Sequence, residues 1–175
     1  MKAVLVILDG IGDSSLNQKT PLETAKTPNL DFLASKAKID YCYTVKKDYI
    51  PESNEGVLSL LGYNSFDIKR GTLEALGVGI NVKNGDLAFR CNFATIDNLT
   101  NLKLIDRRAG RTLTTKEAKI LASSINKELK LPFPFVFVPG IQHRAALVIK
   151  GGFSDNITSV EPKNNKLIFS SPLDD

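Results

Sequence analysis

An unbroken aliphatic run near the start constrains the fold of this chain more than any other feature. Residues 3–8 read AVLVIL and are followed by Asp9 and Gly10. A β-branched and aliphatic run of this length predicts a strand buried on both faces of a parallel sheet. Asp9 would then lie at the carboxyl end of that strand, where open α/β sheets place their ligands. The sequence therefore predicts an α/β fold with a candidate ligand residue at position 9.

Helices and a second strand are predicted to follow in the first half of the chain. Thr27 and Pro28 precede apolar residues at helical spacing, which predicts a capped helix over about residues 28–37. Gly62 ends a later apolar helical pattern. The other predicted elements are a strand, a polar loop and a helix, over residues 39–45, 46–54 and 55–61.

The pattern changes from about Gly85 onward, where short strand-like stretches surround one helix candidate. The helix is predicted over residues 115–129, because its apolar side chains recur on one face. The tail after Gly151 is polar and predicts an extended connection. This arrangement indicates a compact α+β module. Its predicted strands are residues 86–96, 102–106, 133–138 and 144–149.

Bulk properties narrow the class of protein only partly. A chain of 175 residues with 42% hydrophobic residues is long enough to bury a core. The net charge of +4 suits nucleic acid, an acidic membrane surface or a phosphorylated small molecule, and the sign does not choose among them. Cys42 and Cys91 form no CxxC pair, and the aliphatic run is too short to span a membrane. We therefore expect a cytoplasmic protein with no membrane partner.

Two residues in the first half are candidates for chemistry, each with an ordinary alternative. Asp9 is a candidate ligand, although an aspartate after a strand is also a common turn former. Ser53 lies in a loop that enters a helix, where backbone N–H groups favour an anionic phosphate. Serine is equally a frequent helix N-cap, and on local sequence alone that reading is the stronger one.

An arginine-rich turn carries the strongest signal of the second half. Arg107, Arg108 and Arg111 crowd three guanidinium groups around a small-residue turn, and such forks suit carboxylate and phosphate oxygens. The alternatives are a solvated basic loop or a nucleic-acid patch, and the scarcity of interleaved aromatic residues weakens the latter. Neighbouring strands are expected to add the polar side chains of Arg90, Asn92, His143 and Arg144.

Taken together, an ordered series of segments resembles one known family, the archaeal-type cofactor-independent phosphoglycerate mutases. The resemblance runs from the first residue to about Gly152 and matches the N-terminal half of that family. The segments that carry it are MKAVLVILDGIGD, TPLETAKTPNLDFLA, SLLGY, RGTLEALGVGI, GDLAFRCNFAT, DRRAGR and HRAALVI.

The resemblance implies an alkaline-phosphatase-like α/β core, here partial, and an α+β substrate-binding insertion module. On this basis residues 1–80 belong to the core, residues 81–155 form the insertion and residues 156–175 connect onward. It also implies interconversion of 3-phosphoglycerate and 2-phosphoglycerate through a phosphoserine with two divalent metals, manganese, zinc or magnesium. Asp9 matches a metal ligand, and Ser53 matches the metal-bound nucleophile. The positions matched to the substrate pocket are Arg90, Asn92, Asp106, Arg107, Arg108, Arg111, His143 and Arg144.

The chain departs from the family pattern at two places. The nucleophile loop of the family reads GSD, two small residues and His, whereas here Glu52, Asn54 and Val57 stand at the glycine, aspartate and histidine positions. A later Asp-Pro-His reads Glu161-Pro162-Lys163. Relatives are also more than twice as long. We therefore expect an incomplete metal site and no mutase activity from this chain alone.

Three hypotheses follow for the function. The first is a phosphoglycerate mutase-like protein, truncated or degenerate, that binds phosphoglycerate and forms a homo-oligomer or pairs with a chain supplying the rest of the core. The second is a non-catalytic phosphoglycerate-binding or regulatory protein. The third, a basic nucleic-acid-binding domain, ranks last, and we expect no nucleic-acid partner.

Overall fold

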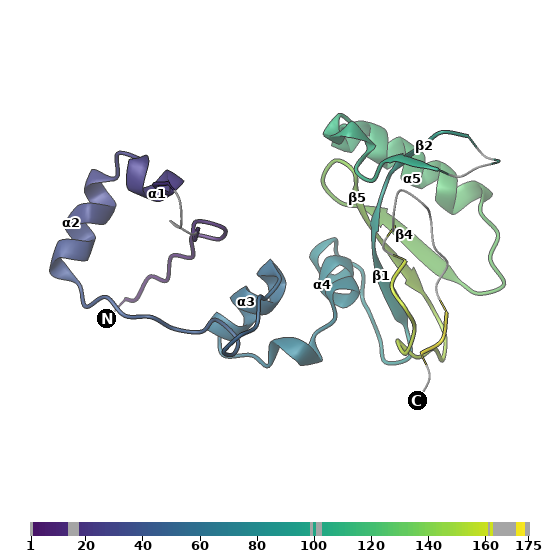
Figure 1. The fold of residues 1–175 in the computed structure, drawn as a ribbon. Coiled ribbons are helices and arrows are strands. Elements are labelled where there is room, and N and C mark those ends of the chain that lie inside the picture. The colour runs from purple at the N-terminus through teal and green to yellow at the C-terminus, as the bar shows by residue number, and fades with distance from the viewer. Residues whose placement is uncertain are drawn as a thin grey trace. The chain divides into compact units, whose positions relative to one another are not determined.

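The chain combines helices and strands and divides into two compact units, Met1–Asp67 and Ile68–Asp175, of which only the second contains assigned strands among the described residues (Figure 1). The computed structural model describes residues 2–13, 18–98, 100, 103–160, 162 and 171–173. The α/β class predicted from the sequence is confirmed at this level. None of the helices in these ranges is long and apolar enough to cross a membrane.

The first unit is helical where the structure assigns regular elements. The predicted helix over residues 28–37 is confirmed as α2, with Pro28 in its first turn. Thr27 occupies the N-cap position, but its hydroxyl donates to a carboxylate oxygen of Asp31 at 3.0 Å and makes no backbone cap. The elements are α1 (Pro21–Thr24), α2 (Pro28–Lys36), α3 (Ser53–Leu60) and the 3-10 helix η1 (Ser65–Asp67).

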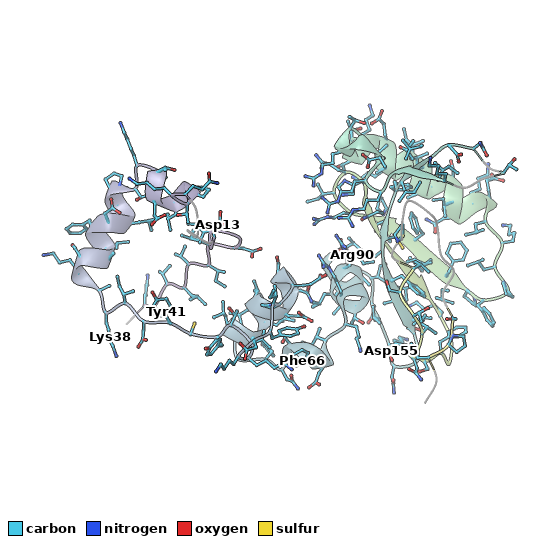
Figure 2. All side chains as sticks on the ribbon, viewed as in Figure 1. Asp13, Lys38, Tyr41, Phe66, Arg90 and Asp155 are labelled. Atoms are coloured by element: carbon cyan, nitrogen blue, oxygen red, sulfur yellow. The ribbon has the colours of Figure 1, made fainter. Side chains whose placement is uncertain are left out.

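The two strands predicted in the first unit are wrong. Residues 3–8 and 39–45 form no strand. Most of their side chains are exposed, with Val4 at 87% and Tyr41 at 100% of full accessibility. Tyr41 is labelled in Figure 2. A strand exists only through hydrogen bonds to a neighbour, and the described residues of this unit provide no such neighbour. The aliphatic side chains of residues 3–8 are therefore of a kind that is usually buried, but the described residues of this unit do not bury them.

The second unit contains the strands. β1 (Leu87–Asn92), β5 (Arg144–Ile149) and β4 (Phe135–Pro139) form an antiparallel sheet in the order β1-β5-β4. β2 (Thr95–Ile96) and β3 (Leu104–Asp106) form a separate antiparallel pair. Each predicted strand region contains an observed strand, although Leu102 lies outside the described residues. The remaining elements are α4 (Arg70–Gly77), the 3-10 helix η2 (Ala109–Arg111) and α5 (Thr115–Glu128).

Small and branched residues form the core of the second unit. Ala75 of α4 packs with Ile80, Ala146 and Val148, and all four are buried. The sequence prediction missed α4, which covers one face of the sheet here. α5 protects the outer edge of β4, because the Asn126 side chain donates to Phe137 O at 2.7 Å and accepts from Phe137 N at 3.1 Å. This amide replaces the strand partner that an edge strand lacks.

Gly71 allows α4 to lie directly against β1. A Cβ added at this position would collide with the carbonyl oxygen of Ala88. Backbone atoms of a sheet strand do not move aside cheaply, so we expect Gly71→Ala to destabilise the second unit by about 1 to 3 kcal/mol, the range for overpacking. Thermal and urea unfolding measure this loss.

Gly77 in the same helix is the matched control. A Cβ there would meet nothing within 4 Å, and its backbone is not left-handed. Gly77→Ala should therefore leave stability unchanged or raise it by about 0.5 to 1 kcal/mol, because alanine is the better helix former. Equal stabilities for the two variants would contradict the close packing of α4 on β1.

Candidate functional site

The register of β1 and β5 brings four of the predicted site residues to one end of the sheet. Arg90 pairs with Ala146, and Asn92 pairs with Arg144, so the side chains of Arg90, Asn92 and Arg144 share one face. His143 precedes β5, and its carbonyl oxygen accepts from Phe93 N at 2.7 Å. The face of the sheet that carries the buried Ala146 and Val148 under α4 therefore carries polar side chains at its other end.

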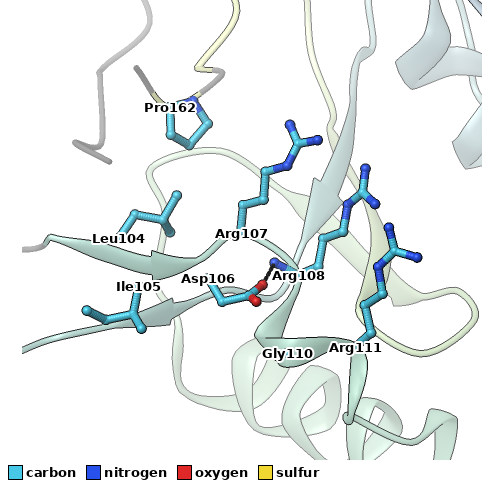
Figure 3. Close-up of a pocket in the computed structure, with 8 residues that line it drawn as sticks. All are labelled: Leu104, Ile105, Asp106, Arg107, Arg108, Gly110, Arg111 and Pro162. Carbon is cyan, nitrogen blue, oxygen red and sulfur yellow. Dashed lines mark hydrogen bonds between the residues drawn. The ribbon is translucent and has the colours of Figure 1, made fainter. Parts of the chain in front are cut away.

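The turn after β3 brings the other arginines to this end. Asn92 Nδ2 donates to the carbonyl oxygen of Arg107 at 3.5 Å, which links β1 to the turn. The three guanidinium groups of Arg107, Arg108 and Arg111 extend to the same side of the turn (Figure 3). They line a pocket of about 460 Å³ with Leu104, Ile105, Asp106, Gly110 and Pro162.

The arginines are close enough to perturb one another. The positive charges of Arg111 and Arg107, followed by burial and the charges of Arg144 and Arg90, lower the pKa of the Arg108 guanidinium. Like charges that lie together in this way destabilise the ligand-free protein. Five arginines from three segments thus form one cluster, whose Coulomb repulsion is relieved when an anion binds.

Two carboxylates accompany the arginine cluster. Glu74 of α4 places Oε2 3.4 Å from Arg90 Nε, and both side chains are partly buried. Asp106 accepts a hydrogen bond from the backbone N–H of Arg108 at 2.6 Å (Figure 3). The sequence prediction missed Glu74, because its partner is distant in the chain and α4 itself was not predicted. No signal in the segment RGTLEALG distinguishes this glutamate from an ordinary surface residue.

His143 is a buried component of this site. It is 8% exposed, and Nδ1 has no hydrogen-bond partner in the described part of the chain. Burial, followed by the positive charges of Arg144, Arg108, Arg111 and Arg90, lowers the pKa of the imidazole. Both causes favour the neutral form of His143.

The first unit brings Asp9 and Ser53 to one small pocket. Both residues line a cavity of about 260 Å³, together with Ile7, Leu8, Gly10, Thr44, Pro51, Glu52, Gly56, Val57 and Leu60. α3 begins at Ser53, two residues before the predicted start, and Glu52 is its N-cap. Ser53 thus stands at the first helical position and is not the cap. Ser53 is exposed.

The two glutamates beside Ser53 are engaged in helix capping. The Glu52 carboxylate accepts from the N3 backbone, and Glu55 Oε2 accepts from Glu52 N at 2.9 Å. Glu55 Oε2 also accepts from the Tyr49 hydroxyl at 2.8 Å. Hydrogen bonding to Glu55 is the first cause that raises the pKa of Tyr49. These bonds stabilise the start of α3 and hold both carboxylates in place.

Whether this pocket suits a divalent metal depends on how many donor atoms its residues supply. Asp9 and Ser53 supply two oxygens, whereas zinc takes about four ligands and magnesium or calcium six or more. No group of three or more His, Cys, Asp or Glu side chains suited to a metal occurs among the described residues. The donors gathered here do not by themselves fit a two-metal centre. Glu161 and Lys163, at the second departure from the family pattern, lie outside the described residues.

Comparisons with known proteins all identify the same family. The sequence model of the family described as 2,3-bisphosphoglycerate-independent phosphoglycerate mutase matches residues 34–173. The mutase of that name from Methanopyrus kandleri is 41% identical over 169 residues, which cover 93% of this chain and 40% of the relative. The one from Thermococcus gammatolerans is 46% identical over 155 residues, covering 86% of this chain and 37% of the relative.

A solved structure gives the same result. The cofactor-independent phosphoglycerate mutase from Thermoplasma acidophilum aligns with a TM-score of 0.51 at 38% identity, covering 68% of this chain and 32% of that one. These matches confirm the resemblance that the sequence motifs carry. The chain spans about two fifths of the length of the curated relatives that it matches.

Proposed function

Because the chain belongs to the 2,3-bisphosphoglycerate-independent phosphoglycerate mutase family, we propose that its arginine cluster binds phosphoglycerate for interconversion of the 3-phospho and 2-phospho isomers. The observation that carries this proposal is the charge of the site. The site gathers five arginines and two carboxylates, which together carry a formal charge excess of three positive charges: Arg90, Arg107, Arg108, Arg111 and Arg144 with Glu74 and Asp106. Phosphoglycerate carries a carboxylate and a phosphate of about −1.5 to −2 at pH 7, which nearly balances that excess.

The second unit is proposed as the substrate-binding module of the family fold. All of the proposed substrate residues belong to Ile68–Asp175, which supports a module that gathers its own ligands. We infer that this unit corresponds to the α+β insertion of an alkaline-phosphatase-like core. The domain limits at residues 80 and 155 stay predictions.

Ser53 is the proposed carrier of the phosphoryl group. Its exposed hydroxyl shares a pocket with Asp9 at the start of α3, where backbone N–H groups favour an anion. The divalent ions that the family uses would activate this hydroxyl. Asp9 and Ser53 would contribute only part of the ligands that such ions need.

A non-catalytic phosphoglycerate-binding or regulatory protein is the second candidate function. It is favoured by the local chemistry at Ser53, where Glu52 and Glu55 are occupied by the helix cap and Val57 stands at the histidine position. The arginine cluster would act in the same way in either case. Turnover, and not binding, separates the two candidates.

Nucleic-acid binding has less support. The residues of known placement around the arginine pocket include no aromatic side chain on which a base would stack. Its concentrated positive charge suits a small trianion.

Titration of the ¹⁵N-labelled chain with 3-phosphoglycerate tests the proposed function. We expect saturable shifts of the arginine Nε–Hε signals from the cluster. Glycerate and inorganic phosphate, which carry fewer charges, should each bind at least about tenfold more weakly. Absence of saturable shifts, or equal affinity for all three anions, would rule the proposal out.

A partner polypeptide is proposed for the first unit. Val4, Tyr41 and Ile50 are 87%, 100% and 95% exposed, together with most other large apolar side chains of that unit. Exposed apolar surface on this scale marks an interface. We infer that this surface is covered either by a second copy of the chain or by a partner chain that supplies the portion of the relatives not spanned here.

We therefore expect the isolated chain to self-associate. Light scattering over a hundredfold range of protein concentration should show an average mass that rises with concentration, because apolar burial drives association. A Tyr41→Lys/Ile50→Lys variant should shift this equilibrium toward the monomer, whereas Lys119→Ala, on the exposed side of α5, should not. A monomer at every concentration would contradict the proposed interface.

A further inference from the structure

The turn that carries the arginines has an unusual backbone. Three successive residues, Ala109, Gly110 and Arg111, have positive φ angles of 47°, 63° and 56°. Glycine adopts this left-handed region freely, but alanine and arginine do so only at a cost in free energy. Something in the fold must therefore hold Ala109 and Arg111 in this conformation.

Asp106 lies where its carboxylate can stabilise the backbone of this turn. Its Oδ1 accepts a hydrogen bond from Arg108 N at 2.6 Å, within the turn (Figure 3). The backbone N–H groups of Arg108 and Gly110 are the two largest causes that lower the pKa of the Asp106 carboxyl. The carboxylate is thus directed at the backbone of the turn, where a negative group satisfies successive N–H donors.

The arginine side chains leave the turn in another direction. The guanidinium groups of Arg107, Arg108 and Arg111 extend away from the Asp106 carboxylate, toward one side of the pocket (Figure 3). Asp106 therefore neither pairs with these groups at short range nor occupies the space in which they converge. Its negative charge would oppose an incoming anion if direct contact were its role.

We propose that Asp106 is a positioning residue, whose carboxylate holds the turn of residues 107–111 in the left-handed conformation that aims the three arginines at a common anion. The inference rests on the proposed function for the identity of that anion, 3-phosphoglycerate. It assigns Asp106 a role in shaping the pocket and not in contacting the ligand.

Two substitutions at Asp106 separate positioning from contact. Asp106→Ala removes the acceptor, so we expect affinity for 3-phosphoglycerate to fall at least about tenfold. Asp106→Asn keeps an acceptor oxygen and removes a negative charge, so affinity should stay within about threefold of the wild type or rise. Adding Ala109→Gly to Asp106→Ala relieves the left-handed strain and should restore part of the loss. Asp67→Ala, which removes a carboxylate from the first unit, is the control for charge.

The conformation of the turn gives a readout that needs no ligand. Strong intraresidue amide-to-Hα Overhauser effects at Ala109 and Arg111 report positive φ; they should persist in Asp106→Asn and vanish in Asp106→Ala. If Asp106→Asn weakens binding as much as Asp106→Ala does, or the Overhauser effects survive in Asp106→Ala, the positioning role is overturned. If wild type binds no phosphoglycerate, the proposed function fails while the turn measurement still decides the role of Asp106.

Discussion

Replacing Arg107 or Arg111 by alanine is expected to weaken 3-phosphoglycerate binding by about 1.5 to 3 kcal/mol, or about 10- to 150-fold. Both guanidinium groups line the same pocket and point to the same side of the turn (Figure 3). Each is expected to donate charge-assisted hydrogen bonds to phosphate or carboxylate oxygens. The two losses should not add in the double variant, because both side chains act on one anion.

Arg111→Ala should also raise the stability of the ligand-free chain. The charge of Arg111 is the first cause that depresses the pKa of Arg108, so removing it relieves repulsion. A binding loss together with a higher melting temperature is the signature expected of a site that is built for an anion. Lys119→Ala, which lowers net charge equally on an exposed face of α5, should change neither quantity. If the arginine variants bind 3-phosphoglycerate as tightly as the wild type does, the cluster is not the binding site.

Saturation with manganese is expected to give this chain no mutase turnover above background. A serine hydroxyl is a weak nucleophile without a metal or an adjacent base. In the described part of the chain, Asp9 is the one carboxylate that lines the Ser53 pocket without being engaged in the α3 cap. The single histidine of the sequence, His143, belongs to the other unit and is buried beside the arginines.

A coupled assay for 2-phosphoglycerate decides the question of turnover. Ser53→Ala is the matched control, because it removes the candidate nucleophile and leaves Glu52 as the cap of α3. Manganese-dependent turnover that disappears in Ser53→Ala would show that the donors in the first unit suffice. It would also exclude the purely regulatory alternative.

The local sequence pattern was enough to predict the elements whose packing partners lie in the same unit. Residues 115–129 carry a one-sided apolar pattern and a Thr114–Glu117 capping box, and α5 forms as predicted. β5 appears at residues 144–149 with the predicted limits. In both cases the same unit buries part of the element: Ala118 and Ala122 of α5, and Ala145, Ala146 and Val148 of β5.

The failed predictions have two different causes. Residues 3–8 carry a strong strand pattern, but a buried strand needs neighbours on both edges, and a pattern does not say whether they are present. α4 was missed because glycines at both of its ends, Gly71 and Gly77, obscure the helical pattern. The structure shows that Gly71 is required by contact with β1 and does not end a helix.

The composition of the arginine site was predictable, but the division of roles within it was not. A run of basic residues after a strand indicates anion binding, and the family motif adds Arg90, His143 and Arg144. The ion pair of Glu74 with Arg90 depends on packing between α4 and β1, which no local pattern encodes. The orientation of Asp106 toward the backbone is visible only in the conformation of the turn.

Calorimetric titration of 3-phosphoglycerate into the chain, with a chelator present, tests the central claim most directly. The proposed ligand groups all belong to the second unit and include no metal donor pair, so binding should be saturable, near one ligand per chain, and unchanged by added manganese. No detectable binding at millimolar ligand, or binding that appears only with manganese, would contradict the assignment of the arginine cluster as the phosphoglycerate site.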